Sequence, residues 1–581
     1  GHAGAEALCR PIAPPAVHRE RTHARTHGIF ISHFGIARCR ISLPFFVPAL
    51  AERTERTFLT ESSRPSAPAQ SAAHSSAKHI AQPERAVSGD QFADSHDHQT
   101  RDNRVIWLLL GAAFVVILNE TIMGVAIPHL MDDLHITAVA AQWLTTGFML
   151  TMAVVIPITG FLLQRFHTRT IFIAAMSLFS LGTATAAMAP GFEVLLVARV
   201  IQASGTAIMM PLLMTTIMTL VAPHARGRMM GRVSIVMSLA PAIGPSLSGL
   251  ILNTLNWRWM FIVVLPIAIV MLLVGMKWML NVSEPRPARV DALSVILSAF
   301  GFGGLVYGLS QIGGGGHGTS AAELAAQATA TTVMWVSLGV GVLSLTAFIL
   351  RQIRLQRSDR ALLDLRVFRS LNFSISMAQM TVLTAAFFGS IILLPLYLQH
   401  VLGLTALESG LIVLPGALVM GLLGPLVGRI YDARGPRILL VPGAIISSAV
   451  MWTFTTVTET TSPFFIMGLQ IVMSLGLALS FTPLFTASLG SLEPRFYSYG
   501  SAIVGTVQQV AGAAGIALFV TLMAANAATA AANGASEVAA QAAGVRGAFV
   551  IGAVLSLLTI VGAFFVRKPV EGADAPELAG H

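Results

Sequence analysis

Long apolar segments follow one another along the chain from Val105 onward, separated by short polar stretches. Each segment reaches about 20 residues, the length that a helix needs to cross the hydrocarbon core of a bilayer. The alternation typical of a membrane β-barrel is absent, and a lipid-exposed backbone must satisfy its own hydrogen bonds. We therefore predict an all-α polytopic membrane protein with 14 transmembrane helices, near residues 105–127, 140–163, 169–190, 194–221, 230–252, 258–280, 291–312, 332–350, 373–399, 407–428, 438–457, 464–488, 500–524 and 547–566.

Basic residues are distributed unevenly over the loops between these segments. The loops after odd-numbered helices hold only Arg258 and Arg546. Because basic loops stay on the cytoplasmic side, both termini are predicted to be cytoplasmic, with the chain crossing the cell membrane many times. This distribution also accounts for the formal net charge of +9, so no nucleic-acid partner is predicted. The loops after even-numbered helices hold Arg165, Arg169, Arg226, Arg228, Arg232, Lys277, Arg286, Arg289, Arg351, Arg354, Arg357, Arg360, Arg366, Arg369, Arg429, Arg434, Arg437 and Arg495.

Composition agrees with a membrane protein and sets the N-terminal region apart. The chain is 54% hydrophobic and 11% charged, whereas a soluble protein carries roughly a quarter charged residues. Residues 1–104 are rich in Arg, His, Ser, Ala and Pro, and we predict a disordered or spurious tail there. Both cysteines, Cys9 and Cys39, lie in this region. The membrane part is therefore predicted to hold no disulfide and no Cys-ligated metal.

An internal repeat divides the membrane part. GFLLQRFHTR begins at Gly160 and the similar GRIYDARGPR begins at Gly428, and both follow an even-numbered helix. Repeated halves around a central site are a recurring plan of transporters. We predict two pseudo-symmetric six-helix halves with two inserted helices between them. The predicted boundaries are 105–280, 281–370, 371–567 and a cytoplasmic tail at 568–581.

Seven motifs carry a resemblance to a known family. They are LNETIMGVAIP, the two loop motifs above, RVIQASGTA, APAIGPSLSG, WRWMF and GSAIVGTVQQVAG. From residue 105 to 567 the chain resembles the major facilitator superfamily and, within it, the fourteen-helix drug:proton antiporters. The resemblance implies the major facilitator fold and proton-driven export of drugs or toxic amphiphiles by alternating access. It implies the proton gradient as the energy source, with no cofactor and no metal.

Two ionisable residues lie deep in the predicted spans. Glu120 is about 12 Å from the outer end of its helix and Arg199 about 8 Å, at 1.5 Å per residue. Burial favours a neutral carboxylate and a nearby guanidinium favours a charged one, so the pair could load and release a proton. The alternatives are a fixed buried ion pair and an Arg199 side chain that reaches the interface. In the family the acid occupies the position of Asn119, one residue earlier, so Asn119 is also a candidate for proton coupling.

The loop motifs predict a cytoplasmic gate. We expect Asp432 to cap the following helix and to pair with Arg434 or Arg437. In the first copy Gln164 replaces the usual Asp of the family, which puts a charged latch in doubt there. Alternatively, these arginines serve only to set the orientation of the helices in the membrane. The predicted gate residues are Gly160, Gln164, Arg165, Arg169, Asp432, Arg434 and Arg437.

APAIGPSLSG resembles the antiporter motif of the fifth helix. Its Gly244, Pro245 and Gly249 are expected to allow close helix approach and bending. In the family this motif accompanies export. Ordinary close packing explains the same residues without specifying a direction.

The substrate is predicted to be a small drug-like molecule held among aromatic, amide and Met side chains, because Met repacks around varied shapes. Any one of these residues could instead face lipid or packed core. The candidates for the cavity are Gln142, Trp143, Phe148, Gln202, Gln379, Tyr397, Gln508 and Gln509.

Three other functions remain open from the sequence: export of one endogenous metabolite, import on the same fold, and a membrane enzyme. An enzyme is not predicted, because no nucleophile or zinc spacing occurs in the membrane part. A P-loop for ATP is also absent. The partners predicted are the substrate, protons and the lipid bilayer. An adaptor protein stays an open possibility.

Overall fold

The computed structural model describes residues 89–282, 285, 291–312 and 321–569. These residues belong to one unit of the chain, Arg85–His581. Within the described ranges the secondary structure consists of helices and no strand. Fourteen of the helices are long and apolar enough to cross a membrane, judged by length and composition. The predicted fold class is confirmed.

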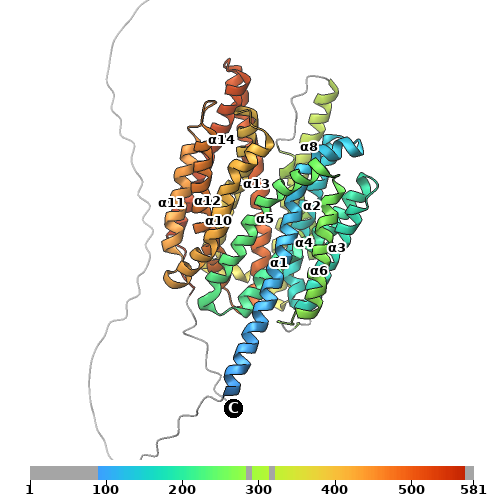
Figure 1. Ribbon diagram of the computed structural model, residues 1–581, viewed down its shortest axis with the longest axis vertical. Coiled ribbons are helices and arrows are strands. Elements are labelled where there is room, and N and C mark those ends of the chain that lie inside the picture. The colour runs from blue at the N-terminus through green and yellow to red at the C-terminus, as the bar shows by residue number, and fades with distance from the viewer. Residues whose placement is uncertain (1–88, 283–284, 286–290, 313–320, 570–581) are drawn as a thin grey trace, which may run out of the picture. The chain divides into compact units, whose positions relative to one another are not determined.

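The helices form two groups that lie side by side, with two further helices between them in sequence (Figure 1). The first group is α1 (Gly89–Leu134), α2 (Ala138–Arg165), α3 (Thr168–Ala187), α4 (Phe192–Leu220), α5 (Arg226–Thr254) and α6 (Arg258–Trp278). The second is α9 (Leu371–Leu396), α10 (Ala406–Arg434), α11 (Arg437–Phe454), α12 (Pro463–Gly490), α13 (Tyr497–Ala532) and α14 (Glu537–Ala563). The inserted helices are α7 (Ala292–Ser310) and α8 (Ala321–Leu355).

Helix α1 is longer than predicted at both ends. It begins at Gly89, within the segment predicted to be a disordered tail, and continues to Leu134. No proline occurs between Pro83 and its apolar part, so nothing in the sequence breaks the helix there. The prediction of a disordered tail rested on the composition averaged over residues 1–104, and this average concealed the start of α1 at Gly89. The rest of the predicted tail, residues 1–88, lies outside the described residues, as do residues 570–581.

Short connections with local caps join the helices. Thr405 and Glu408 form a reciprocal capping box at the start of α10, and Thr137 caps α2. These caps satisfy backbone N–H groups that have no partner within the helix. At the end of α10, Gly435 has a φ of 80°, a value that glycine adopts without strain. The chain can therefore reverse direction within a few residues.

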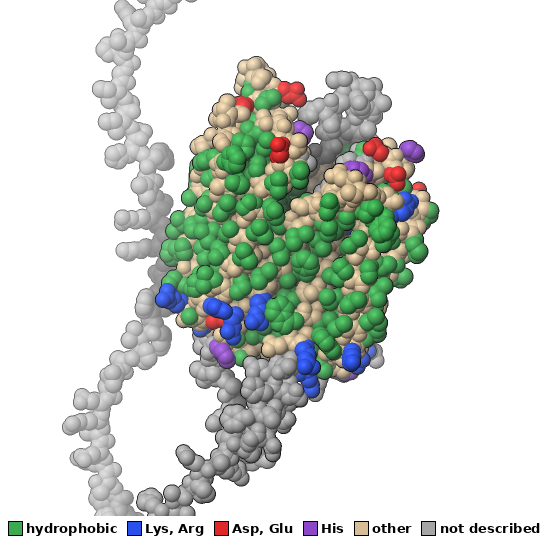
Figure 2. Space-filling model, in the orientation of Figure 1, with side chains coloured by type: hydrophobic (Ala, Val, Ile, Leu, Met, Phe, Trp, Pro, Cys, Tyr) green, Lys and Arg blue, Asp and Glu red, His purple; other side chains and the backbone are tan. Residues whose placement is uncertain are grey.

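Charge separates the two ends of the bundle. On the face shown in Figure 2, Lys and Arg side chains gather mainly at one end and Asp and Glu mainly at the other. We call the end that carries Arg165, Arg228, Arg354, Arg434 and Arg495 the basic end. It holds the loops after the even-numbered helices, as the sequence predicts.

The inserted helices form a hairpin beside the two groups. Helix α7 packs against α2 and α13, and α8 packs mainly against α7. At the basic end the Asp291 carboxylate accepts hydrogen bonds from Nε and Nη2 of Arg351, at 2.6 and 2.7 Å. It also caps α7 by accepting from Ser294. The bonds from Arg351 hold the pKa of Asp291 well below its usual range.

Asp291→Asn is expected to lower the melting temperature of the purified protein by a few degrees near neutral pH. The lowered pKa means that this stabilisation is present above the unfolded-state value of about 4 and is lost as pH falls through the folded-state value. The difference in melting temperature between the parent protein and Asp291→Asn should therefore stay constant between neutral and mildly acidic pH. Thermal unfolding followed by tryptophan fluorescence measures it. The exposed Asp132→Asn serves as control, and equal melting temperatures for the two variants would contradict the assignment.

Candidate functional site

Glu120 lies on α1 and Arg199 on α4, and these two helices pack against each other. The charges of the two residues interact, although they form no ion pair in the described part of the chain. Glu120 is half-buried and has no hydrogen bond to another described residue. The structure thus brings the predicted deep acid and base into one region, and it differs from the fixed ion pair that was the alternative.

Arg199 is held inside the bundle. It is 1% exposed, and its Nη1 donates to Oε1 of Gln202 at 2.7 Å. Its guanidinium lies 4.0 Å from the centre of the Phe148 ring, a favourable cation–π distance. Gln202 in turn donates to Thr183 of α3. The Nε of Arg199 also donates to the carbonyl oxygen of Leu144 in α2 at 3.5 Å. Arg199 therefore does not extend to the interface.

Asn119 and Glu120 occupy different environments on α1. Asn119 is 3% exposed, and its Nδ2 has no hydrogen-bond partner. Glu120 is the more exposed of the two. Next to them, Thr121 lies so close to α5 that a Cβ at Gly244 would collide with its hydroxyl oxygen. Gly244 of α5 thus packs against Thr121, the residue that follows Glu120 on α1.

A glycine seam joins α5 and α10 at the basic end. A Cβ at Gly428 would collide with the carbonyl oxygen of Gly227, and one at Gly424 with the carbonyl oxygen of Gly231. Only glycine permits such an approach of two backbones. These residues were not singled out from the sequence, although GRMMG and GPLVG carry the small-xxx-small spacing that indicates close helix contact.

Asp432 has partners other than those predicted. Its carboxylate oxygens accept from the backbone N–H groups of Gly227 and Arg228, each at 2.8 Å. It therefore caps the start of α5 in the opposite half, where the helix dipole favours a negative charge. The prediction that it caps α11 and pairs with Arg434 or Arg437 was wrong. A helix start 205 residues away in sequence cannot be located by local spacing.

The first copy of the loop motif makes the related contact with α13. Gln164 donates to the carbonyl oxygen of Arg495 at 2.9 Å and to Oγ of Ser498 at 3.0 Å. A Cβ at Gly160 would lie 3.0 Å from Cβ of Ala502. Gln164 carries no charge, so the second seam has a neutral amide where the first has the carboxylate of Asp432, as the sequence indicated. We call the α5–α10 and α2–α13 seams together the basic-end gate.

The remaining predicted gate arginines lie at the edge of this region. Arg169 donates to the carbonyl oxygen of Met276 at 2.5 Å and so ties α3 to α6. Arg165, Arg434 and Arg437 are exposed. Their placement is compatible with a topological role.

The α5–α10 seam does not continue to the other end of the bundle. Gly249 and Gly410 extend the same helix faces at three- and four-residue steps from Gly231 and Gly424. A Cβ at either position would have no atom within 4 Å. Pro245 and Gly410 are exposed. The two halves therefore touch at the basic end and diverge toward the other end.

Several predicted cavity residues are packed between helices in this conformation. Gln202 is fully buried, and Gln379 donates to the carbonyl oxygen of Thr559 in α14 at 3.2 Å. The hydroxyl of Tyr397 donates to the carbonyl oxygen of Thr458 at 2.6 Å. Phe148 lies beneath Arg199. Their predicted contact with substrate stays a prediction that needs another conformation.

The other predicted cavity residues are more accessible. Gln142 is exposed, and Trp143, Gln508 and Gln509 are half-buried. Trp143 stacks on Tyr307 of the inserted helix α7, with ring centroids 5.4 Å apart. Tyr307 was not among the predicted residues, because its contact with α2 depends on where the insertion packs.

Comparison with known proteins agrees with this architecture. Residues 109–516 match the sequence profile of the Major Facilitator Superfamily. The chain is 41% identical over 470 residues to the uncharacterized MFS-type transporter YcnB of Bacillus subtilis (strain 168), covering 81% of this chain and 96% of that protein. It is 40% identical over 466 residues to the lincomycin resistance protein LmrB of the same organism, covering 79% and 95%.

A solved structure shows the same fold. The human organic anion transporter MFSD10 (TETRAN) superposes with a TM-score of 0.56 at 13% identity, covering 80% of this chain and 99% of that one. The predicted resemblance to multidrug-type transporters is confirmed by the relatives. The chain is a multi-pass membrane transporter that belongs to the Major Facilitator Superfamily.

Proposed function

We propose that this protein is a proton-coupled antiporter that exports amphiphilic, drug-like molecules across the cytoplasmic membrane. The observation that carries the proposal is Glu120, a half-buried carboxylate in a membrane span that has no described hydrogen-bond or ion-pair partner. An acid in that setting costs several kcal/mol, on the order of 3 or more, and such residues are functional by default. A proton-coupled transporter needs a group that can exchange a proton with each side in turn.

The divergence of the two halves supports alternating access. In our proposal the basic end faces the cytoplasm, in agreement with the excess of Arg there. The basic-end gate is closed and the opposite end is open, so the structure corresponds to an outward-facing state. Separation of the glycine seam and closure of the outer end would produce the inward-facing state.

The coupling step follows from the partners of Arg199. In the outward-facing state a carboxylate oxygen of Glu120 takes a proton from the outside, and the substrate leaves. In the inward-facing state the proton passes to the cytoplasm, and the anionic carboxylate, stabilised by Arg199, favours binding of the next substrate. Gln202 and Phe148 hold the guanidinium in place throughout, so that the charge of Glu120 changes beside a fixed cation.

The substrate class rests on the relatives and on the accessible side chains. The name of LmrB points to resistance to lincomycin, a reason to expect an amphiphilic antibiotic. Trp143 with Tyr307, and the half-buried Gln508 and Gln509, would offer aromatic surface and amide groups. Export of one endogenous metabolite and import on the same fold are the alternatives. The close packing of Gly244 against Thr121 favours neither direction by itself.

Reconstitution in liposomes tests the proposal. With the pH gradient as the only driving force, lincomycin or a fluorescent cationic dye is expected to move against the direction of proton flow, and internal pH should change with it. Collapse of the gradient with an ionophore should stop transport. Transport that does not respond to the gradient would refute proton coupling. Movement of substrate and protons in the same direction would establish import.

A further inference from the structure

The segment between α8 and α9 contacts the same helix end that closes the second seam of the gate. It comprises residues 356–370 and includes the short helix η3 (Leu365–Arg369). Its residues Ala361, Leu362, Leu363 and Asp364 are each no more than 3% exposed. A connecting loop in a membrane transporter usually runs over the surface, so the burial of four consecutive residues indicates a defined position.

Gln352 of α8 fixes this segment to the inserted hairpin. The side chain is fully buried. Its Nε2 donates to Oγ of Ser294 in α7 at 2.8 Å, and its Oε1 accepts from the backbone N–H groups of Leu362 and Leu363 at 2.8 and 3.2 Å. All of these contacts lie in a water-poor environment, where a satisfied polar network holds a single geometry.

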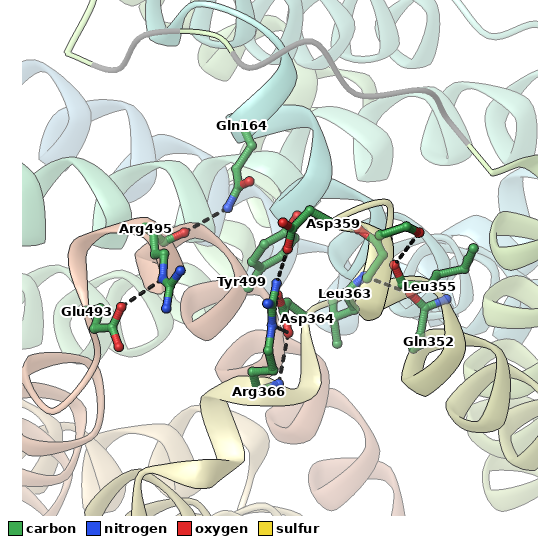
Figure 3. Close-up of polar contacts among 12 residues, drawn as sticks. Gln164, Gln352, Leu355, Asp359, Leu363, Asp364, Arg366, Glu493, Arg495 and Tyr499 are labelled. Carbon is green, nitrogen blue, oxygen red and sulfur yellow. Dashed lines mark hydrogen bonds and ion pairs between the residues drawn. The ribbon is translucent and has the colours of Figure 1, made fainter.

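Asp364 and Arg366 extend the contact to the start of α13. The Asp364 carboxylate caps η3 and accepts from Nε and Nη2 of Arg366. These bonds raise the pKa of Arg366, so its charge is maintained. The guanidinium lies 5.7 Å from the ring centre of Phe496, and Asp359 pairs with it on the other side. Figure 3 shows Asp359, Asp364 and Arg366 with Tyr499, Arg495 and Gln164 in the same view.

Tyr499 completes the connection between the segment and the gate. Its hydroxyl donates to the carbonyl oxygen of Ala361 at 3.4 Å. On its other side, its Cδ1 would lie 3.4 Å from a Cβ at Gly160 of α2. One residue of α13 therefore touches both the α8–α9 segment and the helix against which α13 closes.

The two seams of the gate are held differently. At α5–α10 the carboxylate of Asp432 caps a helix start across the seam. At α2–α13 the corresponding residue is the neutral Gln164, and the α8–α9 segment is packed behind the start of α13 instead. We propose that Gln352 is a positioning residue for the basic-end gate: through the buried α8–α9 segment, the inserted hairpin holds α13 against α2. This inference rests on the proposed alternation of the gate.

Cysteine labelling tests the inference on the full-length protein. Cys9 and Cys39, the two cysteines of the chain, are replaced by Ser, and Ala502→Cys reports the α2–α13 seam. A second single-cysteine variant carries Ser234→Cys instead of Ala502→Cys. It reports the α5–α10 seam, because Ser234 lies next to Gly424. The labelling rate with a membrane-impermeant maleimide applied to the basic end is measured without substrate or pH gradient.

Gln352→Leu keeps the size of the side chain and removes its hydrogen bonds. We expect labelling of both reporters to rise about fivefold or more, an effect of the size that accompanies loss of buried hydrogen bonds. The matched control is Gln356→Ala, one helical turn after Gln352 at the start of η2 (Gln356–Ser358), because Oε1 of Gln356 has no hydrogen-bond partner among the described residues. Ser294→Ala, which leaves the bonds to Leu362 and Leu363 intact, should have a smaller effect than Gln352→Leu.

Several outcomes would overturn the inference. Equal labelling in Gln352→Leu and Gln356→Ala would do so, and so would a rise at Ala502→Cys without one at Ser234→Cys, because that result indicates local fraying of α13. If Gln352→Leu is not monodisperse, Asp364→Asn provides the test with the same expectation. Substrate or a pH gradient should alter labelling in the parent protein. Absence of that response counts against the proposed function, whereas the comparison of variants judges Gln352 independently.

Discussion

Glu120→Gln is expected to reduce gradient-driven transport in liposomes to background while leaving substrate binding largely intact. The amide has nearly the size of the carboxylate but cannot carry a proton between the two sides. Because Glu120 has no described hydrogen-bond partner, its replacement breaks no described hydrogen bond. Gradient-driven uptake of dye and equilibrium binding of substrate, measured on the same preparation, separate the two effects.

Asn119→Ala is the informative companion, because Asn119 is the second residue of α1 that the sequence offers as a candidate for proton coupling. Its Nδ2 has no partner, so truncation to Ala should leave gradient-driven transport within a few-fold of the parent. If Asn119→Ala abolishes coupling and Glu120→Gln does not, then Asn119 lines the transport path and Glu120 is a structural group. A misfolded Glu120→Gln protein would show the acid to be required for packing instead.

Gly428→Ala is expected to prevent closure of the basic-end gate and to bring transport close to background. The added methyl group would overlap the carbonyl oxygen of Gly227, and neither backbone can move aside as a flexible side chain would. The outward-facing state should therefore lose stability relative to the inward-facing state. Transport assays and labelling of the Ser234→Cys reporter measure the two consequences.

Gly410→Ala is the matched control on the same helix. A Cβ at Gly410 meets no atom within 4 Å, so the same chemical change should leave both transport and labelling near the parent values. Normal transport by Gly428→Ala would show that the seam can separate by a further ångström without loss of function. The basic-end gate would then not depend on direct backbone contact.

Position along the membrane normal could be read from the sequence, but lateral neighbours could not. Helix number, the charge asymmetry of the loops and the depth of Glu120 follow from rise per residue and the length of apolar runs. The contact between Asp432 and the start of α5 depends on which helix lies beside α10. No local pattern encodes that, so the predicted partner was taken from the nearest helix in sequence and was wrong.

Repeated motifs indicated where the gate lies without indicating how it is held. The glycines of GRMMG and GPLVG are visible in the sequence, yet only the structure shows that Gly227 meets Gly428 and Gly231 meets Gly424. Gln202 and Gln379 show that a polar residue in a span can bond within helix packing as well as face a cavity. Their contact with substrate stays a prediction.

The sequence by itself determined a fourteen-helix transporter with duplicated halves, a deep acid and base, and a neutral Gln164 where a charge is usual. Hydrophobicity, spacing and loop charge are properties of each segment and need no partner. The tertiary structure alone decided that Asp432 caps the opposite half, that Arg199 is held by Gln202 and Phe148, and that Gln352 links the inserted hairpin to the gate. Most of these contacts join residues on different helices, and their existence depends on how whole helices pack, which side-chain chemistry at one position does not specify.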